Sequence, residues 1–436
     1  MAESNNAFVR TTILPPQEPP LTEKGVIKWL RENLFSGWFN TILTLVGLWA
    51  IYSLVATSLP WWLNSVWNAS SLGECREIVA AKAGPDATGA CWAMVRERWH
   101  QFLFGFYPQE QYWRPILAFV LLFVAIAPVL FQALPRRMMW LSVIYPAVAF
   151  FLLWGGPVWT PVVAMLGFVV LLVAYRLLVA PLGVVIAASI GVVLAILWWM
   201  FLNARVVEGL TALAPIGLEP VASDRFGGFL LALTIGVTAI SFSLPMGILL
   251  ALGRQSDMFL IKTLSVGFIE FIRGVPLITL LFTASLLLQY FLPPNTNFDL
   301  ILRVIILVTF FAAAYIAEVI RGGLAALPRG QYEAADALGL DYWRAQRLII
   351  MPQALKIAIP GIVSTFIGLF KDTTLVAFVG LLDPLKGITQ IVRADIAWKG
   401  IYWEPYIFVG AIFFVICFGM SRYSMYLENK LKRDHR

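Results

Sequence analysis

Two pairs of oppositely charged residues lie near the ends of long apolar segments. Glu270 and Arg273 are three positions apart, as are Glu318 and Arg321. Residues at this spacing meet on one face of a helix, so each pair can form an intrahelical ion pair. We favour the interpretation that both pairs support the ends of these helices. A role in an inner gate or a ligand path is the alternative, because ionisable groups in apolar spans are costly and often functional.

A further polar group, formed by Lys371, Asp372 and Thr373, lies deeper in an apolar segment. Adjacent side chains on a helix point about 100° apart, so Lys371 and Asp372 need different partners. An ion pair with another helix and contact with a substrate both remain open. Pro245 and Pro276 also fall within apolar segments, where carbonyl groups that proline leaves without a donor can line a cavity. The residues that we assign to a substrate path are Arg273, Pro276, Glu318, Lys371, Asp372 and Thr373.

Residues 331–352 form one of the few polar segments of the chain. Their pattern predicts one short helix over about 331–338 and a second over about 342–350. Gly339 can adopt the left-handed conformation that ends the first helix. The Asp341 carboxylate can accept the free backbone N–H groups at the start of the second. The sequence therefore predicts a helix-turn-helix loop between two apolar segments.

The composition is that of an integral membrane protein. Hydrophobic residues make up 60% of the 436 residues and charged residues only 13%, and the mean hydropathy is +0.80. A soluble protein would carry about twice that charged fraction. The 17 tryptophans are typical of a chain with many membrane–water interfaces. The net charge of +7 does not indicate nucleic acid, because basic residues of membrane proteins gather on cytoplasmic loops.

About ten apolar runs follow a polar N-terminal tail. Most reach the ~20 residues that a helix needs to cross the hydrocarbon layer. Helices are favoured there because backbone polar groups have no water to bond in lipid and must bond to one another. We therefore expect an all-α polytopic membrane protein. Two short runs around residues 155–157 could form a tilted or re-entrant pair. The runs are 39–59, 115–134, 138–154, 158–175, 181–202, 227–252, 263–291, 300–320, 354–379 and 405–426.

The distribution of Lys and Arg predicts that both termini are cytoplasmic. With that orientation, 19 of the 32 basic residues fall on cytoplasmic segments, 10 on outer loops and three within spans. An excess inside is the rule for membrane proteins. The 331–352 loop then lies in the cytoplasm, and a tryptophan-rich loop over residues 60–114 lies outside. That loop can be a small covering domain at the interface or a ligand site.

Three cysteines and two histidines limit the chemistry. Cys75 and Cys91 share the predicted outer loop, where a disulfide can form, although two unpaired buried thiols are nearly as plausible. Cys417 lies in the last apolar run. His100 and His435 cannot form a metal cluster, so no metal site is expected. The dipeptide Gly-Lys is absent, so there is no phosphate-binding GxxxxGK[ST] loop, and any ATP hydrolysis must occur on another chain.

The polar loop resembles the coupling loop of bacterial ABC importer permeases. The order is Glu333-Ala334-Ala335, then Gly339 after three residues, Ile349 after nine more and Pro352 after another two. Met351 stands where leucine is usual. Pro352 is also expected to prevent simple continuation of the second short helix. The residues predicted to couple to an ATPase are Glu333, Ala334, Ala335, Gly339, Leu340 and Pro352.

The last half of the chain also resembles polar amino acid permeases of this class. The matching stretches are FIEFIRGVPLITLLF at 268–282, AAYIAEVIRGGLAALPRGQYEAADALGL at 313–340 and FIGLFKDTTLVAFVG at 366–380. The resemblance implies a type I ABC importer transmembrane fold over residues 225–436, with a cytoplasmic coupling loop at 321–353. It leaves 1–38 as a cytoplasmic tail and 39–224 as a membrane extension of about five spans. That extension resembles the larger permease of a general L-amino acid transporter.

The resemblance implies the function and the partners. The chain would be a permease subunit of an ATP-driven L-amino acid importer in the bacterial inner membrane. Its partners would be a related second permease, two ATPase subunits that bind ATP and Mg, and a periplasmic binding protein. No cofactor would bind this chain. Glu333 would contact an ATPase, and Gly339 would set the angle between the two short helices.

Two other classes of protein are the alternatives. An ion-gradient-driven secondary transporter of small polar solutes predicts broken spans at matching positions of inverted halves, and the two halves show no such correspondence. A membrane-embedded enzyme needs a nucleophile, base or metal constellation near a span end, and the sequence reveals none. The secondary transporter is the stronger alternative.

Overall fold

The computed structural model describes residues 25–131, 134–287, 290 and 299–433. The chain forms two compact units, one over Met1–Trp92 and the other over Ala93–Arg436. Both are helical, which agrees with the all-α expectation. The helices of the first unit are α1 (Gly25–Asn33), α2 (Trp38–Leu63) and α3 (Leu72–Ala83).

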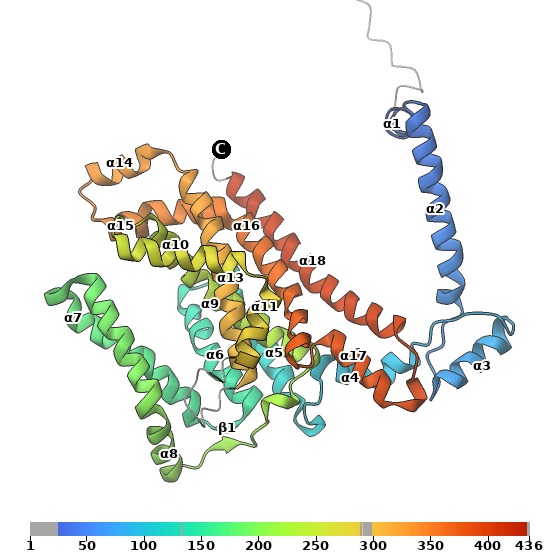
Figure 1. Cartoon of the computed structure of the whole chain (residues 1–436), viewed down its shortest axis with the longest axis horizontal. Helices are drawn as coiled ribbons and strands as arrows, with labels where there is room; N and C mark the ends of the chain where they lie inside the picture. The colour runs from blue at the N-terminus through green and yellow to red at the C-terminus, as the bar shows by residue number, and fades with distance from the viewer. Residues whose placement is uncertain (1–24, 132–133, 288–289, 291–298, 434–436) are drawn as a thin grey trace, which may run out of the picture. The chain divides into compact units, whose positions relative to one another are not determined.

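The second unit contains most of the helices (Figure 1). A two-residue antiparallel ladder, β1 (Gly156–Pro157) with β2 (Gly217–Leu218), is the only named sheet in the part that the structure describes. The helices are α4 (Ala93–Phe104), α5 (Trp113–Leu130), α6 (Met139–Trp154), α7 (Trp159–Leu197), α8 (Asn203–Leu213), α9 (Gly228–Gln255), α10 (Phe259–Gly274), α11 (Leu277–Phe282), α13 (Leu300–Ala325), α14 (Arg329–Ala337), α15 (Tyr342–Ala345), α16 (Met351–Asp372), α17 (Pro384–Ala394) and α18 (Trp403–Arg433).

Eight helical segments of the described chain are long and apolar enough to cross a membrane, against about ten expected. One difference lies in Trp159–Leu213, a segment of 55 residues. The backbone leaves the helical conformation at Gly183, where φ is 79°. Trp198 Nε1 donates to the Val163 carbonyl at 3.0 Å, so the chain folds back on itself. This segment is a helical hairpin, which accounts for the two runs expected at 158–175 and 181–202.

The other difference lies in residues 263–291, which were expected to form one span. The structure divides the described part of this range into α10, α11 and a π turn over Thr283–Leu287. The break falls at Val275 and Pro276, because proline has no N–H to continue the hydrogen-bond ladder. The Pro276 carbonyl instead accepts from the backbone N–H groups of Thr279 and Leu280 at the start of α11.

α13 lies at the centre of the second unit, packed against α9, α10 and α16. The contact with α9 is close because small residues line it. A side chain on Gly247 would meet Ile316 Cγ2 at 2.6 Å, and Ala313 and Ala317 are buried beside it. Small residues allow helix backbones to approach closely in membrane proteins. This packing fixes the position of α13 side chains relative to α16.

The N-terminal part of the second unit contacts the rest of it directly. α4 packs against α9, α17 and α18, and Arg98 Nη2 contacts Asp395 Oδ2 at 2.6 Å. The residues before 225 therefore help to hold the loop that precedes α18. The division of the chain at residues 224 and 225 stays a prediction.

Candidate functional site

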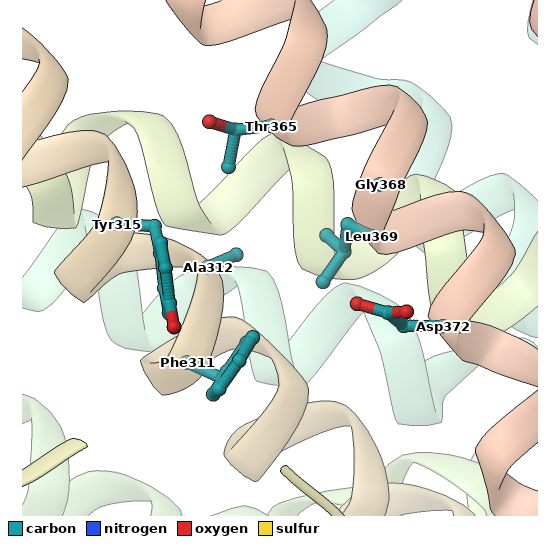
Figure 2. A pocket seen from close by; sticks show the side chains of 7 residues that line it. All are labelled: Phe311, Ala312, Tyr315, Thr365, Gly368, Leu369 and Asp372. Carbon is teal, nitrogen blue, oxygen red and sulfur yellow. The ribbon is translucent and has the colours of Figure 1, made fainter. Parts of the chain in front are cut away.

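A cavity of about 250 Å³ lies between α13 and α16. Figure 2 shows the side chains of Phe311 and Tyr315 on α13 and that of Asp372 on α16 around this space. The full lining is Phe311, Ala312, Tyr315, Thr365, Gly368, Leu369 and Asp372. Phe311 and Tyr315 lie 11 and 15 residues into α13, about 17–23 Å along the helix at 1.5 Å per residue. The cavity therefore lies near the middle of the bundle, and we call it the central cavity.

Asp372 gives the cavity its charge. Its carboxylate points toward α13 in Figure 2, and the hydroxyl-bearing side chains of Tyr315 and Thr365 line the same space. The Thr365 hydroxyl donates to the Gly361 carbonyl at 2.9 Å, so its oxygen is available mainly as an acceptor. The cavity thus presents a carboxylate and hydroxyl oxygens to a small ligand, which suits an ammonium group.

Other residues assigned to the substrate path do not line this cavity. The buried Thr373 hydroxyl donates to the Phe370 carbonyl at 2.7 Å, and Lys371 is exposed. Pro276 directly precedes α11, and its carbonyl already accepts backbone N–H groups. The adjacent positions 371–373 point in different directions on their helix, as their spacing predicted, and only Asp372 among them faces the cavity.

A cluster of five charged side chains joins α9, α10 and α13 near their ends beside the 331–352 loop. Glu318 is its centre: it accepts from Arg321 Nε at 2.6 Å and from Arg254 Nη1 at 3.1 Å, and lies 3.6 Å from Arg273 Nη1. Arg254 also contacts Glu270 Oε1 at 2.9 Å. We call these five residues the inner charge cluster.

The inner charge cluster differs in part from the sequence expectation. Glu318 and Arg321 form the intrahelical pair that their spacing predicts. Glu270 and Arg273 do not pair with each other among the described residues. Glu270 contacts Arg254 instead, and Arg273 lies close to Glu318. An intrahelical pair contributes only about 0.2–0.5 kcal/mol, so tertiary packing decides the partners. Arg254 was not singled out from the sequence.

Arg273 connects this cluster to the cavity. Its guanidinium carbon lies 5.6 Å from the centroid of the Tyr315 ring, within the range of a cation–π contact. Tyr315 lines the cavity and lies three residues before Glu318 on α13. Arg273 and Glu318 therefore flank the cavity wall rather than the cavity itself.

The 331–352 loop begins with α14 as expected. Glu333 and Ala334 are exposed, whereas Ala335 is 1% exposed and packs inward. Gly339 adopts φ 67°, the left-handed conformation that glycine favours. Leu340, which follows Gly339, is half-buried. The loop thus presents an acidic and an apolar side chain to solvent on one short helix.

The second half of the loop differs from the prediction. Asp341 caps α15, accepting from Arg344 N at 2.9 Å. Pro352 does not end the helix, because a π turn over Gln346–Ile350 precedes it and Pro352 falls in the first turn of α16. The π turn has i→i+5 hydrogen bonds, which change the register of the ladder directly before Pro352, the residue that has no N–H to donate. The second short helix is therefore continuous with the membrane helix α16.

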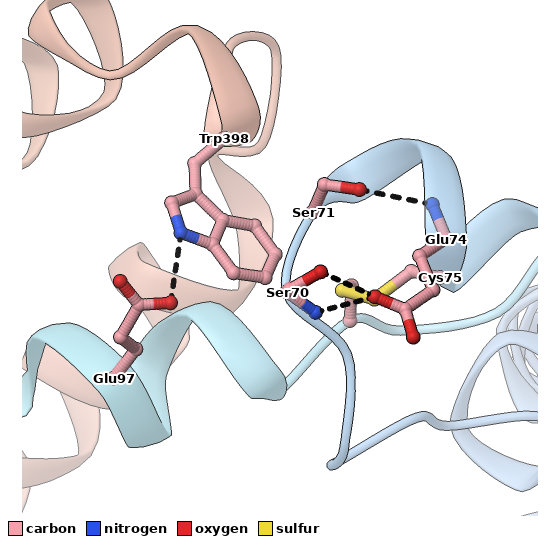
Figure 3. The surroundings of a disulfide bond; sticks show 7 residues. Ser70, Ser71, Glu74, Cys75, Glu97 and Trp398 are labelled. Atoms are coloured by element: carbon pink, nitrogen blue, oxygen red, sulfur yellow. Dashed lines mark hydrogen bonds between the residues drawn. A yellow bond between two sulfur atoms is a disulfide. The ribbon is translucent and has the colours of Figure 1, made fainter.

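The first unit contains a bridge between Cys75 and Cys91 (Figure 3). Cys75 lies on α3, whose first turn is capped by the Ser71 hydroxyl accepting from Glu74 N at 3.2 Å. Cys91 is followed by Trp92, whose ring stacks on that of Trp67 with centroids 5.6 Å apart. Both cysteines are buried. The bridge thus fixes an aromatic group beside the end of α2.

Comparison with known proteins gives the family. Residues 243–433 match the family described as binding-protein-dependent transport system inner membrane component. The glutamate/glutamine/aspartate/asparagine transport system permease protein BztC of Rhodobacter capsulatus is 68% identical over 99% of this chain and 100% of its own length. The chain belongs to this family. It is a multi-pass inner membrane permease subunit, and such subunits carry no catalytic ATPase site, as expected from the sequence.

Two further proteins are similar to this chain. The inner membrane amino-acid ABC transporter permease protein YhdY of Escherichia coli is 38% identical over 95% of this chain and 96% of its own length. A solved structure described as an amino acid ABC transporter with histidines is 31% identical, with a TM-score of 0.41, and covers 46% of this chain and 91% of that one. The permease domain lies in the C-terminal half, where the sequence predicted it.

Sequence reasoning missed three residues at this site. Tyr315 and Thr365 line the cavity, and Arg254 joins two acidic residues. Tyr315 falls in the stretch 313–340 that carried the family resemblance, and its spacing of three from Glu318 was available as a signal. Nothing in the sequence distinguished Thr365 from other hydroxyl residues of apolar spans.

Proposed function

We propose that this permease imports L-amino acids with acidic or amide side chains in an ATP-driven complex. The observation that carries the proposal is the 68% identity over the whole chain to a permease named for glutamate, glutamine, aspartate and asparagine transport. The central cavity supports it, since the Asp372 carboxylate can accept the α-ammonium group that all four substrates share.

The proposed complex contains a second, related permease, two ATPase subunits that hold ATP and Mg, and a periplasmic binding protein. Both termini of this chain lie in the cytoplasm. Glu333 and Ala334, exposed on α14, contact an ATPase. Because α15 continues into α16, movement of the loop by the ATPase shifts the helix that carries Asp372. ATP-driven closure thereby changes access to the cavity.

Reconstitution tests this function. The chain is placed in proteoliposomes with its partner permease, ATPase and binding protein, and uptake of radiolabelled L-glutamate, L-glutamine, L-aspartate and L-asparagine is measured. We expect uptake that requires enclosed ATP and external binding protein. Uptake driven by an ion gradient without ATP would instead support the secondary transporter. Labelled L-lysine is the control for substrate class.

A further inference from the structure

A second cavity, of about 220 Å³, lies at the opposite end of α9 from the 331–352 loop. It is formed where the turn before α5 meets the segment before α9. α9 has 28 residues, which is about 42 Å at 1.5 Å per residue, more than the ~30 Å of a hydrocarbon layer. Its lining is Pro108, Gln111, Glu219, Pro220, Val221, Ala222 and Arg225. We call it the outer cavity.

One polar atom of the outer cavity wall lacks a partner. Gln111 is 8% exposed, and its Nε2 donates to Glu219 Oε2 at 2.6 Å. The Gln111 Oε1 acceptor is buried without a hydrogen-bond partner among the described residues. A buried acceptor left unsatisfied is unfavourable, so rotation of the Gln111 side chain toward a ligand donor in the cavity would gain a hydrogen bond that the empty protein lacks.

The charges around the outer cavity are mixed. Glu219 supplies a carboxylate and Arg225 a guanidinium. Behind the wall, Arg114 is 4% exposed and its Nη1 donates to the Glu219 backbone carbonyl at 2.6 Å. A buried cation raises the positive potential of its surroundings. One carboxylate and two guanidiniums thus favour a ligand that carries an ammonium group and more than one acidic or acceptor group.

We propose that the outer cavity is a second binding site for the transported amino acid. The α-ammonium group contacts Glu219 and Gln111 Oε1, and the α-carboxylate contacts Arg225. The volume suits a metabolite smaller than the drug-sized ligands that fill cavities of about 300–1,000 Å³. The choice of L-glutamate as the ligand rests on the proposed function.

Cysteine protection tests the site without ATP or a binding protein. Ala222 lines the outer cavity and is exposed, whereas its exposed neighbour Asp224 does not line it. Ala222→Cys and Asp224→Cys are each made in a Cys417→Ser background, and the permease complex is placed in nanodiscs. The rate of labelling by a maleimide reagent is measured with and without saturating L-glutamate.

We expect L-glutamate to slow labelling at position 222 at least threefold and to leave position 224 unchanged. Adding Arg225→Gln should abolish the protection, while co-purification with the partner permease reports that the variant is folded. Succinate, which has two carboxylates and no ammonium group, should not protect. Equal rates at position 222 with and without L-glutamate would overturn the proposal, as would equal protection at position 224 or by succinate.

The outcome is separable from the proposed function. If the wild-type complex takes up substrate but L-glutamate does not protect position 222, the proposal of an outer site is contradicted and the proposed function stands. If L-glutamate protects position 222 but uptake does not depend on ATP, the outer site stands and the proposed function is contradicted.

Discussion

Asp372 is the one residue of the central cavity that carries a full charge. We expect Asp372→Asn to lower uptake at least tenfold while substrate-independent ATPase activity of the assembled complex persists. The reason is that a neutral amide replaces the acceptor for the substrate ammonium group, which leaves water only when it is paired. Uptake and ATPase rates in proteoliposomes are the measurements.

Asp86→Asn, at an exposed carboxylate of the first unit, is the control and should transport normally. If Asp372 serves instead as a structural partner, the variant will express poorly or fail to assemble, because an unpaired buried group destabilises the bundle. Normal uptake together with normal assembly would contradict both roles.

Asp383 predicts a dependence of stability on pH. It caps α17, accepting from Leu385 N at 2.9 Å and Lys386 N at 3.0 Å, yet burial raises its pKa above the usual range. A raised folded-state pKa means that the contribution to stability is complete below the unfolded pKa of about 4 and is lost as pH rises through the folded value.

Asp383→Asn keeps a capping oxygen but cannot ionise. We therefore expect its apparent Tm, relative to wild type, to be higher at pH 8 than at pH 4. Thermal unfolding of the purified complex at the two pH values measures this, with the exposed cap variant Asp341→Asn as control. A Tm difference that does not change with pH would rule out ionisation of Asp383 as the cause.

Single residues were predictable from the sequence where a charged side chain stands in an otherwise apolar segment. Asp372 and Glu318 were singled out because carboxylates are rare in apolar segments. Tyr315 and Arg254 were missed because their roles depend on neighbours from other helices: Arg273 covers the Tyr315 ring, and Arg254 contacts two helices. Local spacing carries no information about such contacts.

Among the helical elements, α14 carries the exposed residues that we propose contact an ATPase. We expect Glu333→Lys to leave membrane insertion intact but to weaken ATPase association or stop transport, because it reverses the charge of an exposed side chain on a short helix. Co-purification of the ATPase and uptake are measured. The same change at Asp86 is the control, and wild-type uptake by Glu333→Lys would contradict the role.

Substitutions at Gly339 test whether its backbone conformation, which sets the angle between α14 and α15, matters for docking. Its φ of 67° suits glycine and disfavours β-branched residues, although no atom would meet an added Cβ within 4 Å. We expect Gly339→Val to reduce ATPase association and Gly339→Asn, which tolerates this conformation, to preserve most of it. Equal association by the two variants would show that the conformation of residue 339 is unimportant for docking.

The bridge between α3 and the segment at Cys91 predicts a thiol count. In denatured, unreduced protein we expect a maleimide reagent to label only Cys417, and reduction to expose all three thiols. By the chain-entropy model, closing a loop of 16 residues stabilises the first unit by about 3 kcal/mol. Cys75→Ser should therefore lower its stability by up to that amount. Three labelled thiols before reduction would contradict the bridge.

Whole helices were easier to predict than their breaks. Runs of about 20 apolar residues identified most spans, and the hairpin at Gly183 agrees with two of them. The π turn before Pro352 was not predictable, because it depends on how α15 and α16 are held by the rest of the bundle. Proline predicts a lost hydrogen bond, and packing decides whether the helix stops there.

At the scale of the second unit, the inner charge cluster joins three helices beside the proposed coupling loop. Glu318→Gln would leave Arg254, Arg273 and Arg321 close together without their shared carboxylate. We expect a loss of about 1.5–3 kcal/mol, the usual value of hydrogen bonds to charged groups. Thermal unfolding of the complex measures it.

Asp257→Asn, at an exposed carboxylate in the turn after α9, is the control for loss of negative charge. Arg321→Gln should cost less than Glu318→Gln, because Glu318 then keeps two partners. An unchanged Tm in Glu318→Gln would mean that solvent or lipid satisfies the three guanidiniums equally well.

α9 spans the distance between the outer cavity and the inner charge cluster, and Pro245 divides it unequally. The hydrogen-bond ladder is interrupted there, so bending costs least at that point. Seventeen residues precede Pro245 and ten follow it, which gives arms of about 25 Å and 15 Å at 1.5 Å per residue. If α9 bends at Pro245, the shorter arm that carries Arg254 can follow the 331–352 loop while the longer arm, which leads to the outer cavity, keeps its place. The two ends of α9 can then move independently.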